Sequence, residues 1–208
     1  MNVIEPNKKQ EAEHMEELLE SDASAKPDAA AKRPRWMTET EDWAKTLVIA
    51  FSVVLLLHFF VFNLSKVEGH SMEPTLTEHE WLFVNKFIFL VSKPKFGDVV
   101  ILKEPDTGDG EQKYLVKRIV GTPGDKIEVH DQRLYRNGQL VEEPYTDSLI
   151  EDMSYGPEII NEGHFFVMGD NRHSRASLDS RSFHAVPEEL IRGRADFILW
   201  PFKEIRAL

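Results

Sequence analysis

The chain has 208 residues, enough for one ordinary domain with a sizeable core and accessory segments, and its formal net charge is -11 at pH 7. A phosphate backbone would repel this acidic chain, and no Lys/Arg-rich patch with interleaved aromatic residues offsets the charge, so we expect no nucleic acid partner. The absence of cysteine excludes disulfides, thiolate zinc sites and cysteine nucleophiles.

Residues 1–42 are polar and charged, and they are interrupted by Ala and Pro, most clearly in ESDASAKPDAAAKRPR. Such a composition buries too little apolar area to offset the entropy lost on ordering. An isolated helix as short as EAEHMEELLE is marginal in water. We therefore predict a disordered tail.

A long apolar run follows the tail. The stretch from Leu47 to Phe62 contains no charged residue, and its flanks extend it to the roughly 20 residues that a helix needs to cross a bilayer. We predict a transmembrane anchor at residues 43–64. Basic residues are more frequent before the run than closely after it, which places the tail in the cytoplasm and residues 65–208 outside the cytoplasmic membrane. A cleaved signal peptide and a buried soluble helix are the alternatives, but the preceding tail is too long for an ordinary signal peptide.

Residues 65–208 consist of short β-branched runs separated by turn residues, as in GDVVILKEP and KYLVKRIVGTPGD. The Asn-Gly pair in RNGQ supplies the positive φ angles of a tight hairpin turn. This pattern predicts a mainly β domain. The apolar stretch Phe87–Val91 is either a core strand or a surface segment that dips into the outer leaflet of the membrane.

Ser71 lies in VEGHSMEPTL, directly after the apolar run. Gly69 allows a sharp turn and Pro74 restricts the chain that follows, so Ser71 could sit on a rigid corner with its own N–H free to donate. A serine becomes a nucleophile only beside a base and near donors for the oxyanion that forms. The same pattern is also typical of an ordinary turn serine, so this segment alone leaves both interpretations open.

The base for such a serine could come from two places. His70 is a poor candidate, because neighbours in an extended segment point to opposite sides, and no other histidine lies in an HExxH motif. Lys117 alternates with aliphatic residues in KYLVKRIVG, and burial of that face would lower the pKa of its amine from about 10.4 toward neutrality. In the alternative arrangement Lys117 faces water and Arg118 points inward.

A third candidate segment is GDNRHSRASLDSR, after the apolar run HFFVM. It is either a polar surface loop or a source of ion pairs and a hydroxyl that orient a neutral lysine. The charged and hydroxyl residues that could do so are Asp170, Arg172, Ser174, Ser177, Asp179, Ser180 and Arg181.

With these segments the chain resembles the bacterial type I signal peptidases, membrane-anchored serine/lysine endopeptidases that remove signal peptides from exported proteins. The resemblance rests on GHSMEPTL, KFGDVVIL, YLVKRIVGTPGD and GDNR with SLDSR, in this order, and covers roughly residues 40–205. It implies preprotein signal peptides as substrates, bound in an extended form, with Ala-like residues preferred at the first and third positions before the cut. It further implies contact with the lipid bilayer, a secretion translocon nearby, and no metal or cofactor.

The resemblance also assigns roles to individual residues. It makes Ser71 the nucleophile, Lys117 the general base and Ser177 a hydrogen-bond partner of that lysine. Gly69 stands where some members have a serine that donates to the oxyanion. The supporting ion pairs that it implies are Arg118 with Asp170, and Asp179 with Arg181.

The family fold is a largely antiparallel β catalytic domain with a smaller inserted β region, which would fall at about residues 126–163. Two features depart from the family pattern. Four residues rather than two separate GDNR from S-x-D-S-R, so either Ser177 or Ser174 could be the hydroxyl that reaches Lys117. His184 stands where glycine is common. We expect a local change in the loop and retained activity.

Two other functions fit parts of the sequence. A self-cleaving repressor-type protease would use the same serine and lysine, but the apolar run and the lack of a DNA-binding segment argue against it. A catalytically impaired, membrane-anchored domain that binds peptides would account for the longer spacing in the last motif. The presence of both Ser71 and Lys117 argues against this second alternative.

Overall fold

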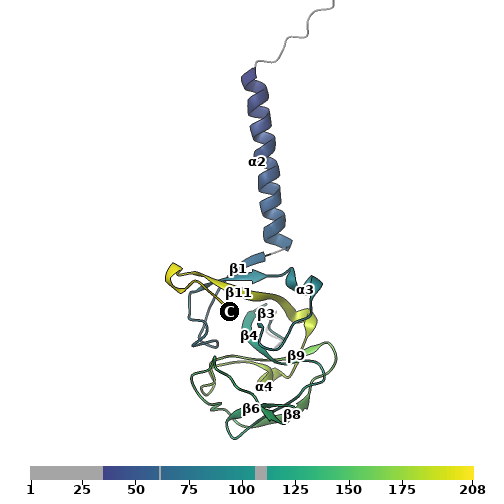
Figure 1. Ribbon diagram of the computed structural model, residues 1–208, viewed down its shortest axis with the longest axis vertical. Helices are drawn as coiled ribbons and strands as arrows, with labels where there is room; N and C mark the ends of the chain where they lie inside the picture. The colour runs from purple at the N-terminus through teal and green to yellow at the C-terminus, as the bar shows by residue number, and fades with distance from the viewer. Residues whose placement is uncertain (1–34, 61, 106–111) are drawn as a thin grey trace, which may run out of the picture. The chain divides into compact units, whose positions relative to one another are not determined.

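The computed structural model describes residues 35–60, 62–105 and 112–208, without the side chains of 35–39, 41 and 57–60 (Figure 1). The first 34 residues of the predicted disordered tail therefore lie outside the described part of the chain.

The predicted anchor segment is largely helical. Helix α2 spans Arg35–Phe60, so it begins before Trp43, and residues 62–64 of the expected anchor belong to a strand instead. Within the helix, Lys45 Nζ lies 3.3 Å from Asp42 Oδ1 one turn away. Among the residues described, no helix is both long enough and apolar enough to cross a membrane.

The remainder of the chain is a mainly β domain with two antiparallel sheets, which confirms the predicted class (Figure 1). The larger sheet has eight strands in the order β1-β2-β11-β3-β4-β9-β10, with β12 paired to β11. Its strands are β1 (Phe62–Lys66), β2 (Trp81–Asn85), β3 (Val99–Lys103), β4 (Tyr114–Gly121), β9 (His164–Met168), β10 (Val186–Pro187), β11 (Ile191–Trp200) and β12 (Arg206–Ala207).

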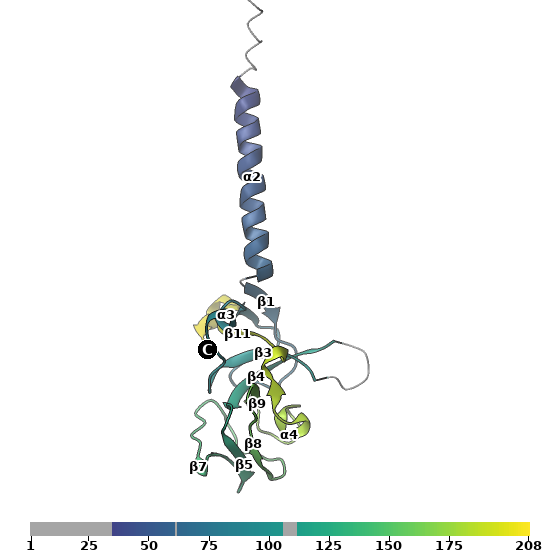
Figure 2. The ribbon, with the colours of Figure 1, turned by 90° about the vertical axis from the view of Figure 1, so that its right-hand side faces the viewer.

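The smaller sheet has the order β7-β6-β5-β8 and lies in the chain between β4 and β9, where the inserted region was expected (Figure 2). Its strands are β5 (Lys126–His130), β6 (Arg133–Arg136), β7 (Gln139–Leu140) and β8 (Tyr155–Ile159). Asn137 and Gly138 join β6 to β7 with φ angles of 55° and 76°, so the hairpin predicted from this pair is confirmed.

Short helices connect the strands. They are α3 (Ile88–Val91), α4 (Ser180–Phe183), η1 (Glu188–Leu190) and η2 (Phe202–Glu204). The Asn85 side-chain oxygen accepts a hydrogen bond from the Ile88 N–H (3.1 Å) and so starts the turn that leads into α3. Leu90 is 76% exposed and Val91 67%, so the core-strand interpretation of Phe87–Val91 is wrong.

Strand β4 brings the candidate residues together. It pairs with β3 through Val100 and Lys117 and with β9 through Arg118 and Met168. Consecutive strand residues point to opposite faces, yet Lys117 is 2% exposed and Arg118 8%, because apolar side chains cover both faces of the sheet here. The segment that follows β9 consequently starts beside both cations.

Candidate active site

Ser71 and Lys117 are in direct contact. Lys117 Nζ lies 2.7 Å from Ser71 Oγ, and it also donates a hydrogen bond to the Val116 carbonyl oxygen at 3.0 Å. Ser71 belongs to the turn segment between β1 and β2, whereas Lys117 lies inside β4. The fold thus places an amine within hydrogen-bond distance of a serine hydroxyl, the distance that proton transfer requires.

The surroundings of Lys117 favour its neutral form. Burial lowers the pKa of the Lys117 amine from 10.5 to about 8. The negative charges of Asp179 and Asp170 oppose this change, and the positive charge of Arg181 adds to it. A substantial fraction of the lysine is therefore unprotonated in weakly alkaline solution, where it can accept a proton.

The backbone at Ser71 is held by the segment after β9. Asn171 donates from its backbone N–H to the Ser71 carbonyl oxygen (3.1 Å) and from its side-chain amide to the His70 carbonyl oxygen (3.0 Å). The Ser71 N–H itself donates to no acceptor within the described part of the chain. The nucleophile segment is fixed through its carbonyl groups, and one N–H beside the hydroxyl is left free.

The expected ion pair of Arg118 and Asp170 is present on the opposite face of β4. Its atoms pair as Nε with Oδ1 at 2.9 Å and Nη2 with Oδ2 at 2.6 Å, and the Asp170 side chain is fully buried. Thr75 Oγ1 donates to the same carboxylate at 2.6 Å, and the Tyr145 ring covers the guanidinium at 4.1 Å. Because Thr75 follows Ser71 closely in the chain, this pair joins the nucleophile segment to β4 and to the segment after β9.

The second expected ion pair, Asp179 with Arg181, lies close enough to Lys117 for both charges to affect the pKa of its amine. Arg181 Nε and Nη2 contact the two oxygens of Asp179 at 2.9 and 2.8 Å, and Asp179 also accepts from the Gly169 N–H at 3.2 Å. Burial by itself would raise the pKa of Asp179, but the Arg181 guanidinium lowers it below its usual range. Asp179 is thus a fixed negative charge near the lysine.

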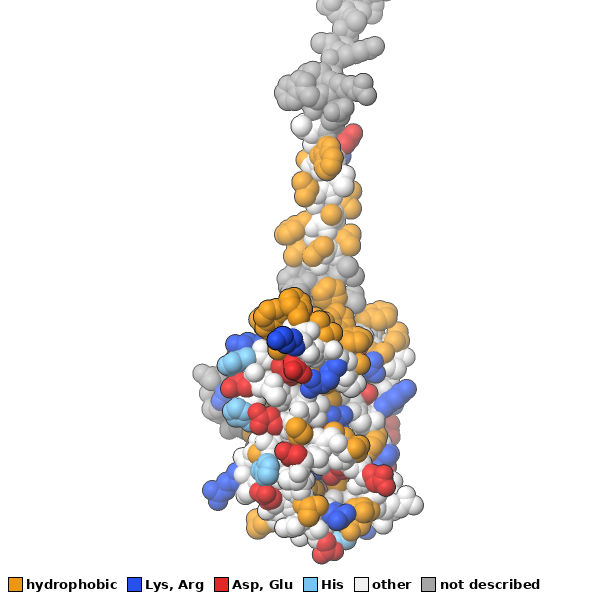
Figure 3. Space-filling view, turned by 60° about the vertical axis from the view of Figure 1, so that its left-hand side comes forward, with side chains coloured by type: hydrophobic (Ala, Val, Ile, Leu, Met, Phe, Trp, Pro, Cys, Tyr) orange, Lys and Arg blue, Asp and Glu red, His pale blue; other side chains and the backbone are white. Residues whose placement is uncertain are grey.

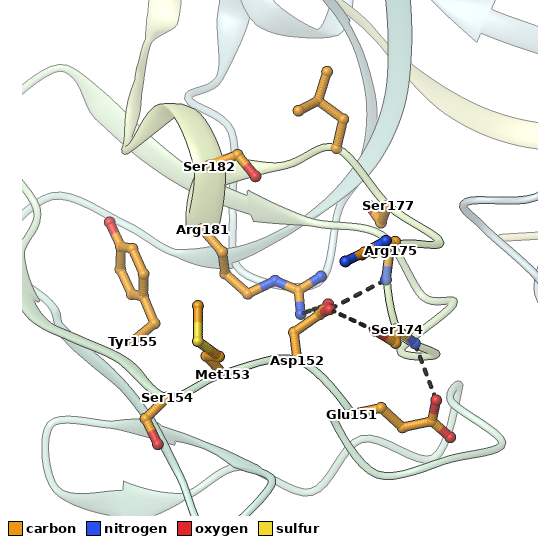
Figure 4. A pocket seen from close by; sticks show the side chains of 11 residues that line it. Glu151, Asp152, Met153, Ser154, Tyr155, Ser174, Arg175, Ser177, Arg181 and Ser182 are labelled. Carbon is orange, nitrogen blue, oxygen red and sulfur yellow. Dashed lines mark hydrogen bonds and ion pairs between the residues drawn. The ribbon is translucent and has the colours of Figure 1, made fainter.

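The two serines that could have reached Lys117 are both placed by the structure (Figure 4). Ser174 is exposed, and its Oγ lies 3.4 Å from Asp152 Oδ1 and forms no hydrogen bond with Lys117. The Ser177 Oγ is buried and has no hydrogen-bond partner among the described residues, so the implied bond to Lys117 is not formed. The Ser177 hydroxyl is nevertheless close enough to Asp179 to help lower the pKa of that carboxyl, without the alignment of a hydrogen bond.

His70 and Gly69 face an acidic pair. His70 Nδ1 lies 2.9 Å from Glu73 Oε1 and Nε2 lies 3.9 Å from Glu78, and the hydrogen bond to Glu73 raises the pKa of the imidazole. Gly69 has a φ of 83° and donates its N–H to Glu78 at 3.3 Å. The imidazole is thus engaged by carboxylates rather than by the Ser71 hydroxyl, although residues 69–75 form bends and turns and not the extended segment that the alternation argument assumed.

A cavity of 550 Å³ opens beside the serine and the lysine, both of which line it. Two stretches of chain form its walls. Residues 65–69 include the end of β1 and the segment that follows it, and residues 112–117 lead into β4 and include its start. Apolar side chains of Val67, Met72 and Leu115 contribute to the lining. The cavity offers room for an extended peptide along two backbone edges.

Sequence reasoning missed several partners of the site residues. Arg172, a candidate from the last motif, is fully buried, pairs with Glu143 at 2.6 Å and donates to the Gly169 carbonyl oxygen at 2.7 Å. Glu143 stands in a stretch that gave no catalytic signal, whereas Asn171 and Thr75 lie inside the motifs GDNR and GHSMEPTL but were given no role, because the partners of all three are distant in the chain. Only a known tertiary fold would have linked them.

The chain is similar to known proteins over most of its length. The family described as "Signal peptidase, peptidase S26" matches residues 40–200. Signal peptidase I of Bacillus licheniformis is 38% identical over 175 residues, which are 79% of this chain and 91% of that protein. Signal peptidase I T of Bacillus subtilis (strain 168) is 39% identical over 177 residues, 79% of this chain and 88% of that protein. A crystal structure of a signal peptidase I from Enterococcus faecalis V583 covers 50% of this chain and 97% of its own, with 28% identity and a TM-score of 0.41.

Proposed function

Since the chain belongs to the signal peptidase family, peptidase S26, and is a serine endopeptidase that cleaves signal peptides from preproteins, we propose that Ser71 and Lys117 perform this cleavage. The resemblance inferred from four short motifs is thereby confirmed. The observation that carries the proposal is the 2.7 Å contact between Ser71 Oγ and a lysine amine that is almost completely buried. The peptide-binding alternative leaves this geometry without a purpose. The repressor-type protease would use the same pair, but the family and the relatives that match the chain are signal peptidases.

In the proposed reaction Ser71 Oγ attacks the carbonyl carbon of the scissile bond while the neutral Lys117 amine takes the hydroxyl proton. The C–N bond then breaks, and the Lys117 ammonium gives its proton to the leaving amine. The signal peptide remains attached to Ser71 as an ester. A water molecule hydrolyses this ester, again with Lys117 as the base, and the free serine is restored.

The negative oxygen that forms during attack needs hydrogen-bond donors. The free Ser71 N–H supports its assignment as one of them, since it lies next to the attacking oxygen and has no acceptor of its own in the described structure. The Gly69 N–H is engaged by Glu78. The substrate itself would lie extended in the 550 Å³ cavity, paired with backbone groups of its walls.

We further propose that the helical part of the expected anchor, residues 43–60, holds the protein in the cytoplasmic membrane as a single span, with the N-terminus in the cytoplasm and the β domain outside, near a secretion translocon. The proposal is supported by the apolar side chains that α2 exposes between Leu47 and Leu56, where burial in lipid would remove a large cost of contact with water.

The β domain carries a second apolar surface, formed at one end by exposed side chains (Figure 3). Trp81 and Trp200 are register partners on β2 and β11, and the Trp200 ring lies 4.6 Å from that of Phe202. With the exposed Leu90 and Val91 of α3, these side chains suit contact with the outer leaflet. The test is flotation of residues 66–208 with vesicles, since no association at all would contradict membrane contact by the domain.

The catalytic proposal is tested with the full chain in detergent and a purified preprotein. The wild type is expected to release the signal peptide, whereas Ser71→Ala and Lys117→Ala are each expected to lose at least about a thousandfold in rate. His70→Gln is the matched control, because its ring faces Glu73, and it should cleave at nearly the wild-type rate. Unchanged cleavage by Lys117→Ala would refute the pair, and an inactive wild type would favour the peptide-binding domain.

A further inference from the structure

The loop of residues 173–176, which contains the longer spacing of the last motif, docks on the chain just before β8 (Figure 4). Glu151 accepts a hydrogen bond from the Ser174 N–H at 3.0 Å, and its other oxygen lies 2.9 Å from the His173 ring nitrogen Nδ1. The segment before β8, in the smaller β region, therefore holds the loop that immediately precedes Ser177.

Asp152 makes a different set of contacts from its neighbour Glu151. Its Oδ1 accepts from the Arg175 N–H at 3.1 Å, and its Oδ2 accepts from Arg181 Nη1 at 2.8 Å. Across the described ranges, Asp152 is the only residue whose side chain bonds both this loop and Arg181. Its side chain is 27% exposed, whereas that of Arg181 is 8% exposed.

The Arg181 guanidinium connects Asp152 to residues that contact the reacting groups. It binds both oxygens of Asp179, and Asp179 binds the Gly169 N–H. Gly169 packs so closely against the Ser177 side chain and the Ser71 carbonyl oxygen that an added Cβ would collide with both. Contacts thus lead without a break from Asp152 to the backbone of the nucleophile.

The charged groups along this chain of contacts also affect the pKa of Lys117. Asp179 is the main charge that favours the ammonium form of Lys117, and Arg181 acts in the opposite sense. The Asp152 carboxylate lies on the far side of the guanidinium and offsets part of its positive charge. Removal of that carboxylate would leave Arg181 with a stronger effect on the lysine.

We propose that Asp152, a residue of the smaller β region, is a positioning residue for peptide cleavage: through its contact with Arg181 it fixes Asp179 near Lys117. The inference rests on the proposed roles of Ser71 and Lys117. A partly exposed ion pair adds little net stability, so the main consequence of losing Asp152 is a change in activity rather than in folding.

The experiment compares Asp152→Asn with Glu151→Gln in the full-length protein in detergent, by steady-state cleavage of a preprotein from pH 6 to 10. Glu151→Gln is the matched control, since it weakens the docking of the same loop without a contact to Arg181. Asp152→Asn is expected to lower kcat about tenfold through displacement of the site, with KM changed less than about twofold. The acidic limb of its kcat/KM profile should move to lower pH, whereas Glu151→Gln should leave both quantities near the wild type.

Equal effects of the two variants, or a tenfold loss in Asp152→Asn without movement of the acidic limb, would overturn the proposal in favour of a purely structural role. If Asp152→Asn does not fold, Asp152→Glu decides, because it keeps the charge and shifts its position. A reduced kcat with an unmoved acidic limb supports the proposal, and a moved limb refutes it. Failure of the proposed pair itself gives another pattern, namely cleavage by Lys117→Ala with any residue at position 152.

Discussion

Replacement of Lys117 by Met is expected to abolish cleavage and at the same time to change how stability depends on pH. The hydrogen-bond partners of Lys117 Nζ are the Ser71 hydroxyl and the Val116 carbonyl, both uncharged, and no carboxylate within the described structure forms an ion pair with it. Folding therefore removes an ammonium group from water without a direct counter-ion. Methionine has a similar length and carries no charge.

The size of the effect follows from the pKa of Lys117, which falls from 10.5 to about 8 on burial. Each pH unit between these values corresponds to about 1.4 kcal/mol, so burial of the charged form costs about 3 kcal/mol at and below pH 8. The unfolded chain holds the extra proton between pH 8 and 10.5, so wild-type stability rises with pH across this window. The free energy of unfolding of Lys117→Met lacks this slope.

The measurement is urea unfolding of both proteins in the same detergent, followed by tryptophan fluorescence from pH 7 to 11. Lost hydrogen bonds and altered packing contribute a constant to the difference between the proteins, whereas the cost of the buried charge depends on pH. We expect the difference to move by about 3 kcal/mol, in favour of the wild type, as pH rises from 8 to 10.5. Exposed Lys95→Met serves as the control. A difference that stays constant with pH would refute the argument.

Other outcomes follow from the same geometry. The kcat/KM for a preprotein should rise about tenfold per pH unit up to about pH 8 and then level off, because the neutral amine of the buried lysine is the base; a flat profile from pH 6 would contradict this. Asp170→Asn should lower the free energy of unfolding by about 3–5 kcal/mol in urea titrations, since it leaves Arg118 buried and unpaired. Thr75→Val should lower it by only about 1 kcal/mol, and equal losses would contradict the difference. Gly169→Ala should reduce kcat about a hundredfold, because the new Cβ collides with the Ser177 side chain; an unchanged kcat in cleavage assays would show that the contact is not needed.

Local features of the β domain were predictable from sequence because they depend on neighbouring residues. Asn137 and Gly138 both adopt positive φ angles, which few other residue pairs tolerate, so the hairpin between β6 and β7 followed from two letters. The alternation argument for His70 did not apply, because it assumed an extended segment and residues 69–75 form bends and turns, in which the His70 ring contacts Glu73.

The environment of Lys117 could not be decided in the same way. If one face of a strand is exposed to solvent, period-two alternation allows either Lys117 or Arg118 to point into the core, and it does not decide between them. In β4 both residues are buried, because core clusters cover both faces of the sheet. The position of a strand in the middle of a sheet is a property of the whole fold, and no local pattern encodes it.

The limits of the first helix and the partners of the last motif were also beyond local patterns. Polar composition suggested disorder up to residue 42, yet α2 begins at Arg35. The motif GDNR marked Arg172 as a candidate, but its partner Glu143 lies in a segment without a recognisable motif. Composition and spacing describe which groups are present, whereas the pairing of distant charges depends on chain topology.

The hydrogen bonds from Asn171 have a consequence for the order in which the enzyme is made. They join Asn171 to His70 and Ser71, which lie 101 and 100 residues earlier in the chain, whereas Ser71 and Lys117 are only 46 apart. A growing polypeptide that has been synthesised as far as β8 already contains both reacting groups. At that stage β9 has not yet paired with β4, and the hydrogen bond from Asn171 to the Ser71 carbonyl oxygen cannot form. The backbone of the nucleophile is therefore fixed only after β9 and the segment that carries Asn171 have been translated and have paired with β4.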